Sequence, residues 1–182
     1  MEQGSAEASW VLGRIFLLGI HIEPDLEQAK TCFENAQEYG YKNKVMLQSS
    51  MGDVYRLKGQ PRQALVWYSR ALANEQCPYI VYEKVGDLYR GDKSQMPDNS
   101  KALEYYLAVA EPELIKYAAG FYRKIGDMYA EGKGAEKNVV IARGWYAKAR
   151  DAKKKLKKHM ARFEFDPDDY KVEFDPRDIM PW

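Results

Sequence analysis

The segment IGDMYAEGKGAEKNVVIARGWYAKA, residues 125–149, contains the pattern that decides the fold. Its first part is an apolar residue, a glycine, a polar residue and two apolar residues, and it occurs four times. The copies are LGRIF from Leu12, MGDVY from Met51, VGDLY from Val85 and IGDMY from Ile125. Their motif glycines are Gly13, Gly52, Gly86 and Gly126. The intervals of 39, 34 and 40 residues between them are typical of helical repeats.

A second pattern begins with an alanine 12 or 16 residues after each motif glycine. The alanines are Ala29, Ala64, Ala102 and Ala142. Cys-Phe, Trp-Tyr, Tyr-Tyr or Trp-Tyr follows three and four residues later, and Ala or Val seven residues later. Both patterns place apolar residues on one face of a helix. Each copy therefore predicts a helical hairpin, in which the glycine allows close helix approach and the small alanines receive aromatic rings.

At this point the chain resembles the Sel-1-like repeats, which are close relatives of the tetratricopeptide repeats. The match is best from Gly126 to Ala149 and extends to Leu12–Ala36 and Val85–Val109, whereas Val45–Pro78 resembles a plain 34-residue tetratricopeptide repeat. The resemblance covers about residues 6–162. It implies an all-α, right-handed α-α superhelix (a solenoid) of about four hairpins, of a family whose members are scaffolds and adaptors.

These patterns also predict the limits of the parts. We expect repeats at about 6–40, 44–78, 79–112 and 113–162, followed by an extended tail at 163–182. The expected hairpins pair 6–18 with 25–39, 44–58 with 61–74, 79–91 with 98–110 and 113–131 with 137–162. Asp25 with Gln28 resembles a capping box, and Pro61 suits a first helical position. We expect the tyrosines of both patterns to pack in the core: Tyr55, Tyr68, Tyr89, Tyr106, Tyr129 and Tyr146.

Composition excludes several functional classes. Among 182 residues, 28 Lys and Arg balance 27 Asp and Glu, which argues against nucleic acid as a partner. The two cysteines are expected to be reduced, with Cys32 buried in an aromatic slot. No nucleophile, P-loop or metal-ligand motif is present, so we expect no enzyme activity, cofactor or metal. No apolar run is long enough for a membrane span, and we expect a soluble, cytoplasmic protein, with secretion as an effector or loss of an upstream signal left open.

The residue that directly follows each motif glycine is the candidate partner-binding position. We call Arg14, Asp53, Asp87 and Asp127 the post-glycine residues. They are expected on the concave face of the solenoid, together with Ser49, Arg56, Glu83, Arg90, Arg123 and Glu131. One hypothesis is that Asp53–Arg56 and Asp87–Arg90 are only solvated pairs. The other is that the post-glycine carboxylates form a ladder that binds a basic surface of a partner.

The expected function is that of a non-catalytic scaffold or adaptor that binds another protein in the concave groove. The alternative is a bacterial immunity protein or effector that neutralises one specific protein. Homo-oligomers could also form through the uncapped N-terminal repeat.

The C-terminal segment reverses the charge of the helix before it. Residues 143–162 contain nine Lys and Arg against one Asp, including Lys153 and Lys158, whereas residues 163–182 contain seven acids and two bases. The tail is rich in aromatic residues, and its candidate contact residues are Phe165, Tyr170, Phe174 and Trp182. We expect it to dock on the chain's own basic helix, with its own groove or a partner as the other destinations.

Overall fold

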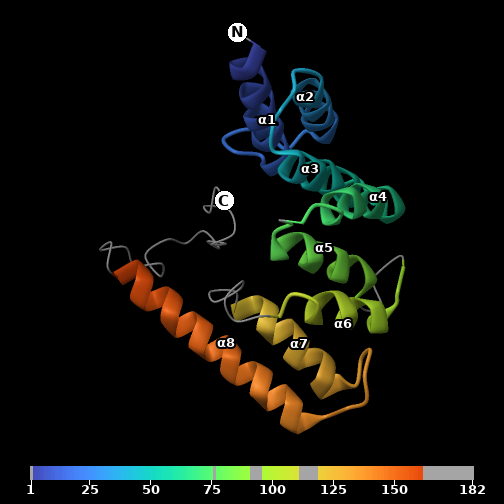
Figure 1. Cartoon of the computed structure of the whole chain (residues 1–182), viewed down its shortest axis with the longest axis vertical. Coiled ribbons are helices and arrows are strands. Elements are labelled where there is room, and N and C mark those ends of the chain that lie inside the picture. Colours follow the sequence, from blue (N-terminus) through green and yellow to red (C-terminus); the bar gives the residue numbers. More distant parts are fainter. Residues whose placement is uncertain (1, 76, 91–95, 111–118, 162–182) are drawn as a thin grey trace. The chain divides into compact units, whose positions relative to one another are not determined.

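A computed structural model describes residues 2–75, 77–90, 96–110 and 119–161, with side chains from residue 5 onward. Every regular element in these ranges is a helix (Figure 1). The chain divides into two compact units, Met1–Leu88 and Tyr89–Trp182. The predicted tail lies outside the described residues, as does the segment 113–118 of the expected seventh helix.

The eight helices found in the described residues follow the predicted order. The first unit contains α1 (Glu2–Leu18), α2 (Leu26–Glu38), α3 (Lys44–Leu57), α4 (Pro61–Leu72) and all but the last residue of α5 (Tyr79–Tyr89). The second unit contains α6 (Asn99–Leu107), α7 (Ala119–Glu131) and α8 (Val139–Met160). The all-helical fold is therefore confirmed, and the described helix ends lie within a few residues of those predicted.

Polar side chains cap the second helices α2, α6 and α8. Asp25 Oδ1 accepts a hydrogen bond from the backbone N–H of Gln28 at 2.9 Å, which satisfies a free donor of the first turn of α2. Asn138 does the same for Ile141 in α8 at 3.0 Å. Pro61 occupies the first position of α4, where its missing N–H costs nothing.

In the first, second and fourth repeats, a ring from the second helix packs directly onto the motif glycine of the first helix. A Cβ atom added to Gly13 would lie 2.5 Å from Cε1 of Phe33, and one added to Gly126 would lie 2.6 Å from Cε1 of Tyr146. At Gly52 the added atom would overlap the ring of Tyr68. The glycines therefore act as sockets for aromatic rings, which explains why both patterns recur together.

The first unit has a core built from two consecutive hairpins. Phe33 and Ala36 of α2 form one apolar cluster with Leu47, Met51 and Val54 of α3. Trp10, Phe16, Leu26, Tyr41, Tyr55 and Trp67 pack around this cluster. The second helix of the first repeat thus covers the first helix of the second repeat.

The second unit repeats this arrangement with other rings. Tyr106 of α6 meets Phe121 of α7 edge-on, with ring centroids 5.7 Å apart. Tyr122 of α7 stacks on Trp145 of α8 at 5.9 Å, and the ammonium of Lys148 lies over the Trp145 ring. Aromatic contacts of this kind stabilise hairpins beyond simple burial.

Burial confirms part of the predicted core. Tyr68 and Tyr106 are fully buried, whereas Tyr55, Tyr89, Tyr129 and Tyr146 are only partly buried. Cys32 is also only partly buried, so the prediction that it lies in the core is wrong. The reason is visible in the register, because the aromatic slot on the motif glycine is filled by the next residue, Phe33.

Candidate functional site

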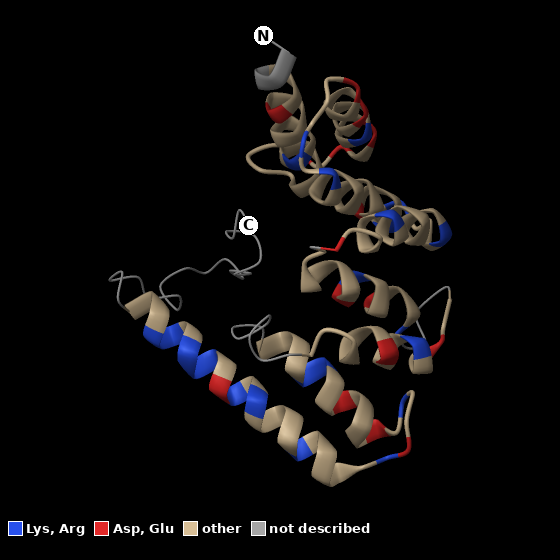
Figure 2. Cartoon of the chain, in the orientation of Figure 1, with Lys and Arg blue, Asp and Glu red and all other residues tan. Residues whose placement is uncertain are grey.

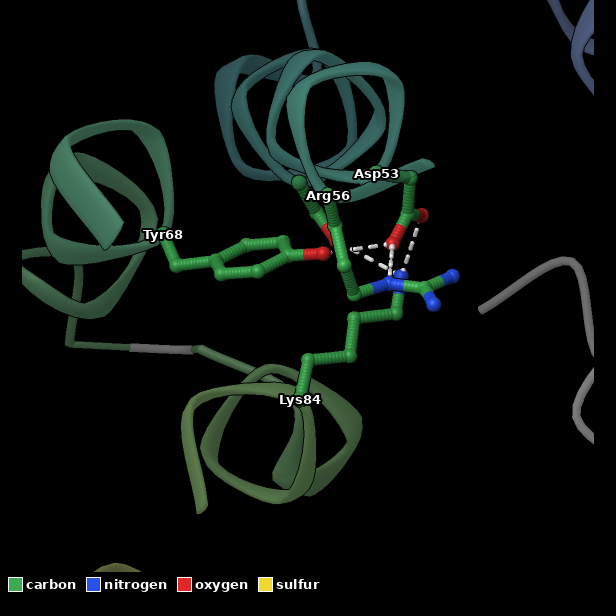
Figure 3. Close-up of polar contacts among 5 residues, drawn as sticks. Asp53, Arg56, Tyr68 and Lys84 are labelled. Carbon is green, nitrogen blue, oxygen red and sulfur yellow. Dashed lines mark hydrogen bonds and ion pairs between the residues drawn. The ribbon is translucent and has the colours of Figure 1, made fainter. Parts of the chain in front are cut away.

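The post-glycine carboxylates have structural partners that the sequence did not reveal. In the first unit, Oδ1 of Asp53 accepts a hydrogen bond from the Tyr68 hydroxyl at 2.7 Å (Figure 3). Oδ2 of Asp53 accepts one from the Lys84 ammonium at 2.6 Å, and Arg56 Nε lies 3.8 Å from Oδ1. Only 15% of the Asp53 side chain is exposed. This group, Asp53, Arg56, Tyr68 and Lys84, is called the Asp53 cluster below.

The Asp53 cluster connects three helices. Asp53 is on α3, Tyr68 on α4 and Lys84 on α5, so one carboxylate joins its own hairpin to the first helix of the next repeat. Lys84 also donates to the Ser49 hydroxyl at 3.1 Å. A partly buried carboxylate with two strong donors is held in place more firmly than a surface ion pair.

Asp127 repeats half of this arrangement in the second unit. Its Oδ1 accepts a hydrogen bond from the Tyr146 hydroxyl at 2.9 Å, from a ring that covers Gly126. Its Oδ2 lies 3.9 Å from the Arg90 guanidinium, near the outer limit of an ion pair. The Asp127 side chain is 31% exposed, so this carboxylate remains accessible from solvent.

The first repeat departs from this rule. Its ring on the motif glycine is Phe33, which has no hydroxyl, and its post-glycine residue is Arg14. The Arg14 guanidinium lies over the Trp10 ring, 5.3 Å from its centroid. In the second and fourth repeats the ring on the motif glycine is a tyrosine and the post-glycine residue is an aspartate. This correlation between two sequence positions was the signal from which the Tyr–Asp hydrogen bond could have been predicted.

The other predicted site residues divide by exposure. Ser49 and Glu83 are 5% and 2% exposed, so they lie beneath the surface that a partner would touch. Arg56, Asp87, Arg123 and Glu131 are exposed, and Arg14 and Arg90 are partly buried. We expected all of these residues on one accessible face, but Ser49 and Glu83 are buried and cannot contact a partner.

Three charged residues of α7 that reach solvent form a continuous line along the helix. Arg123, Asp127 and Glu131 are four residues apart, which places them on one side of the helix. We call these three residues the α7 row. Phe121, Ile125 and Met128 face the core from the opposite side. Glu131 also pairs with Lys133 in the following loop at 3.0 Å.

The Tyr–Asp pairs change the titration of the ring hydroxyls. Burial is the largest cause that raises the pKa of Tyr68 well above its ordinary value of 10.0, and the charge and hydrogen bond of Asp53 act in the same direction. The pKa of Tyr146 is raised by the same causes, with Asp127 as the acceptor. These hydroxyls therefore remain protonated donors at neutral pH.

Neither cysteine forms a disulfide, and both thiols are partly buried. Burial raises the pKa of Cys77 from 9.0 to about 11, and it raises that of Cys32 as well. Because the folded-state pKa of Cys77 is raised, its contribution to stability is complete below about pH 9 and is lost as the pH rises toward 11.

We expect Cys77 to react slowly with iodoacetamide in the native protein. The raised pKa leaves about a hundredfold less thiolate near pH 8 than in the unfolded chain, and the thiolate is the nucleophile. Mass spectrometry of a Cys32→Ser variant, alkylated with and without urea, measures this difference. Equal rates in the native and unfolded protein would show that Cys77 is not shielded.

Basic residues are concentrated in the second half of α8 (Figure 2). The exposed lysines are Lys153, Lys154, Lys155, Lys157 and Lys158. Ala152 on the same stretch is buried, so this part of α8 has one covered and one solvated side. Lysines at the end of a helix also interact favourably with its dipole.

No group of three or more His, Cys, Asp or Glu is placed to bind a metal ion within the described ranges. None of the described helices has both the length and the apolar composition needed to cross a bilayer.

Comparison with known proteins identifies the class of repeat. The chain matches the Sel1 repeat at residues 6–36, 49–75, 82–111 and 121–153. These matches cover more than half of the sequence, so the chain belongs to the Sel1 repeat family. Sel1 repeat proteins generally mediate protein–protein interactions, and their repeat is typically a non-catalytic interaction fold.

Two solved structures share this fold. One is a protective antigen present in uropathogenic Escherichia coli strains that displays an SLR fold, with 25% identity and a TM-score of 0.59 over 87% of this chain. The other is a Sel1 repeat protein from Oxalobacter formigenes, with 20% identity and a TM-score of 0.60 over 81% of this chain. The chain spans 34% of the first and 58% of the second. No curated protein matches the chain.

Proposed function

We propose that this chain is a non-catalytic adaptor or scaffold that binds another protein through exposed post-glycine residues and their neighbours. The observation that carries the proposal is the α7 row, in which three charged side chains line the solvated side of a repeat helix. The general role of Sel1 repeats in protein–protein interaction supports it. The narrower alternative, an immunity protein or effector with a single target, stays a prediction.

The chemistry of the α7 row favours a basic partner surface. Asp127 and Glu131 give the row a net negative charge, and the 3.9 Å contact between Asp127 and Arg90 is loose. A lysine or arginine of a partner can therefore replace Arg90 at Oδ2, while the Tyr146 hydroxyl keeps Oδ1 in place. Electrostatic matching of this kind sets association rate and specificity.

The first unit contributes fewer groups to this proposal. Both oxygens of Asp53 are already bound within the Asp53 cluster, so this carboxylate positions Arg56 and Lys84 and is not itself a contact. The Arg56 side chain is 43% exposed, and Asp87 is exposed as well. These two are the contact candidates that we retain in the first unit.

Charge reversal in the α7 row tests the proposal. We expect Glu131→Lys, combined with Asp127→Asn, to reduce partner recovery by about tenfold, since like charges would then oppose a basic partner surface. Asp127→Asn keeps an oxygen for the Tyr146 hydroxyl, so the hairpin should remain folded. The measurement is affinity capture from cell extract with quantitative mass spectrometry, followed by titration with the purified partner at two salt concentrations.

A control places the same Glu→Lys substitution on another helix. Glu104→Lys alters an exposed residue of α6, a second helix of the same unit. Recovery should be unchanged with this variant, and circular dichroism should show that all variants are folded. Equal recovery with the α7 row variant and the parent, or no protein enriched by the parent, would contradict the proposed site.

A further inference from the structure

The outer side of α1 exposes a line of apolar side chains. Val11 and Leu12 are each 48% exposed, and Leu18 is 47% exposed. Ala8 is exposed and Ile15 is partly buried on the same side of the helix. We call Ala8, Val11, Leu12, Ile15 and Leu18 the α1 stripe. Large apolar side chains gathered on one surface mark an interaction site more often than scattered ones do.

The other first helices give an internal comparison for these positions. Leu12 directly precedes its motif glycine, and the equivalent residues Met51, Val85 and Ile125 are 3%, 0% and 0% exposed. Ala8 lies five residues before its glycine, and the equivalent residues Leu47, Val81 and Phe121 are 4%, 1% and 1% exposed. The first repeat is therefore the one in which this side of the first helix is open.

The packing within each unit shows what kind of element covers these positions. On α3, the residues Leu47 and Met51 are covered by Phe33 and Ala36 of the helix before it. On α7, the corresponding Phe121 is covered by Tyr106 of α6. The position is thus a helix-packing surface, and α1 presents it without a covering helix among the described residues.

The α1 stripe is more apolar than the equivalent positions of α3, α5 and α7. Val11 stands two residues before its glycine, where α3, α5 and α7 have Ser50, Lys84 and Lys124. The spacing of Ala8, Val11, Ile15 and Leu18 alternates three and four residues, which is the period of two helices packed along a common seam. An apolar seam with no charge in it requires an apolar partner.

We infer that the α1 stripe is a self-association surface, covered by the α1 stripe of a second copy of this chain. A two-fold contact covers both stripes at once and closes the assembly, whereas a head-to-tail contact would leave an open stripe at one end. Antiparallel pairing of Val11 with Leu12 brings Glu7 of one copy to about the level of Arg14 of the other. These opposite charges flank the same edge of the stripe, which favours the antiparallel arrangement.

The size of the stripe sets the expected strength. One helix side is smaller than a standard protein interface, so the dimer should be reversible, with a dissociation constant in the micromolar range or weaker. This dimer uses the outer side of α1, whereas the proposed partner surface lies on α7, so each can fail without the other.

Sedimentation velocity of the purified full chain, up to the highest soluble concentration, tests the inference. We expect a monomer–dimer equilibrium, and we expect Leu12→Glu to weaken dimerisation by at least about tenfold because it buries a charge in the seam. Val66→Glu is the matched control, since Val66 is 52% exposed on α4 and should leave the dissociation constant unchanged. Unchanged thermal melts would show that both variants are folded.

A charge swap then tests the antiparallel arrangement. Glu7→Arg should weaken the dimer, and Glu7→Arg with Arg14→Glu should restore it, because the pair across the two-fold axis is re-formed. A parent chain that is monomeric at all concentrations, a dimer that Leu12→Glu leaves intact, or a double swap that fails to restore binding would overturn the inference.

Discussion

We expect Gly52→Ala to lower the free energy of unfolding by about 1–3 kcal/mol, the usual range for an overpacked core. The added methyl group would overlap the Tyr68 ring. That ring cannot move away easily, because Tyr68 is fully buried and its hydroxyl is bound to Asp53. The clash therefore outweighs the helix propensity that alanine gains over glycine, which is at most about 1 kcal/mol.

The same substitution should have the opposite sign at Gly144. This residue lies inside α8, and an added Cβ atom would have no neighbour within 4 Å. Gly144→Ala should therefore stabilise the protein by about 0.5–1 kcal/mol. Urea unfolding followed by far-UV circular dichroism compares both variants with the parent. If Gly52→Ala and Gly144→Ala changed the stability in the same direction, the claim that the motif glycine makes room for an aromatic ring would be refuted.

Removal of the Asp53 carboxylate should have a comparable effect. We expect Asp53→Ala to cost about 2–3 kcal/mol, because it leaves the buried Tyr68 hydroxyl without its acceptor and the Lys84 ammonium without its counter-charge. Asp53 is therefore expected to contribute to the stability of the first unit. Its carboxylate is a bridge between helices as well as a charge.

An exposed ion pair of equal length provides the control. Glu27 and Lys58 are also 2.6 Å apart, but 77% of the Glu27 side chain is exposed. Glu27→Ala should cost less than about 1 kcal/mol, since solvent screens such pairs. If the two substitutions had equal effects in the same unfolding experiment, burial of the Asp53 cluster would be irrelevant to its strength.

The helices could be predicted from the sequence because their signals are local and repeated. The apolar period, the cap at Asp25 and the proline at Pro61 each act within one helix or loop. Because the pattern occurs four times, a weak match in one repeat can be recognised by comparison with the other repeats. This is why the ends of α2, α3 and α4 are so close to those expected.

The chemistry between helices was less predictable. The sequence shows Asp53, Tyr68 and Lys84 at separations of 15, 16 and 31 residues, and no helical period connects them. Only the packing of three helices brings their polar atoms within hydrogen-bonding distance. The contrast between Phe33 with Arg14 and Tyr68 with Asp53 was the available clue, and it requires knowing which ring faces which glycine.

The solvent exposure of individual side chains could not be predicted from the sequence. Glu83 and Glu131 both appear as polar residues on a first helix, yet the first is 2% exposed and the second has a 52% exposed side chain. Leu12 and Met51 occupy the same repeat position, but only Met51 is covered. A repeat pattern predicts which side of a helix is apolar, and neighbouring helices determine whether that side reaches solvent.

The contacts of the second carboxylate oxygen, Oδ2, therefore distinguish the structural role expected for Asp53 from the binding role proposed for Asp127. In Asp53 this atom is held by Lys84 at 2.6 Å, and in Asp127 its nearest cation, Arg90, is 3.9 Å away. The Tyr hydroxyl is common to both. We expect the first carboxylate to stabilise the first unit, and we propose the second as a contact for the partner.

A double-mutant cycle between Asp53 and Tyr68 tests the central claim, that the post-glycine carboxylate and the ring on the motif glycine form one unit. The free energies of unfolding of the parent, Asp53→Ala, Tyr68→Phe and the double variant are measured in urea. We predict a coupling energy of about 1–2 kcal/mol, since each single change leaves the other group without its hydrogen bond. Additive effects, with a coupling energy below about 0.3 kcal/mol, would contradict the claim.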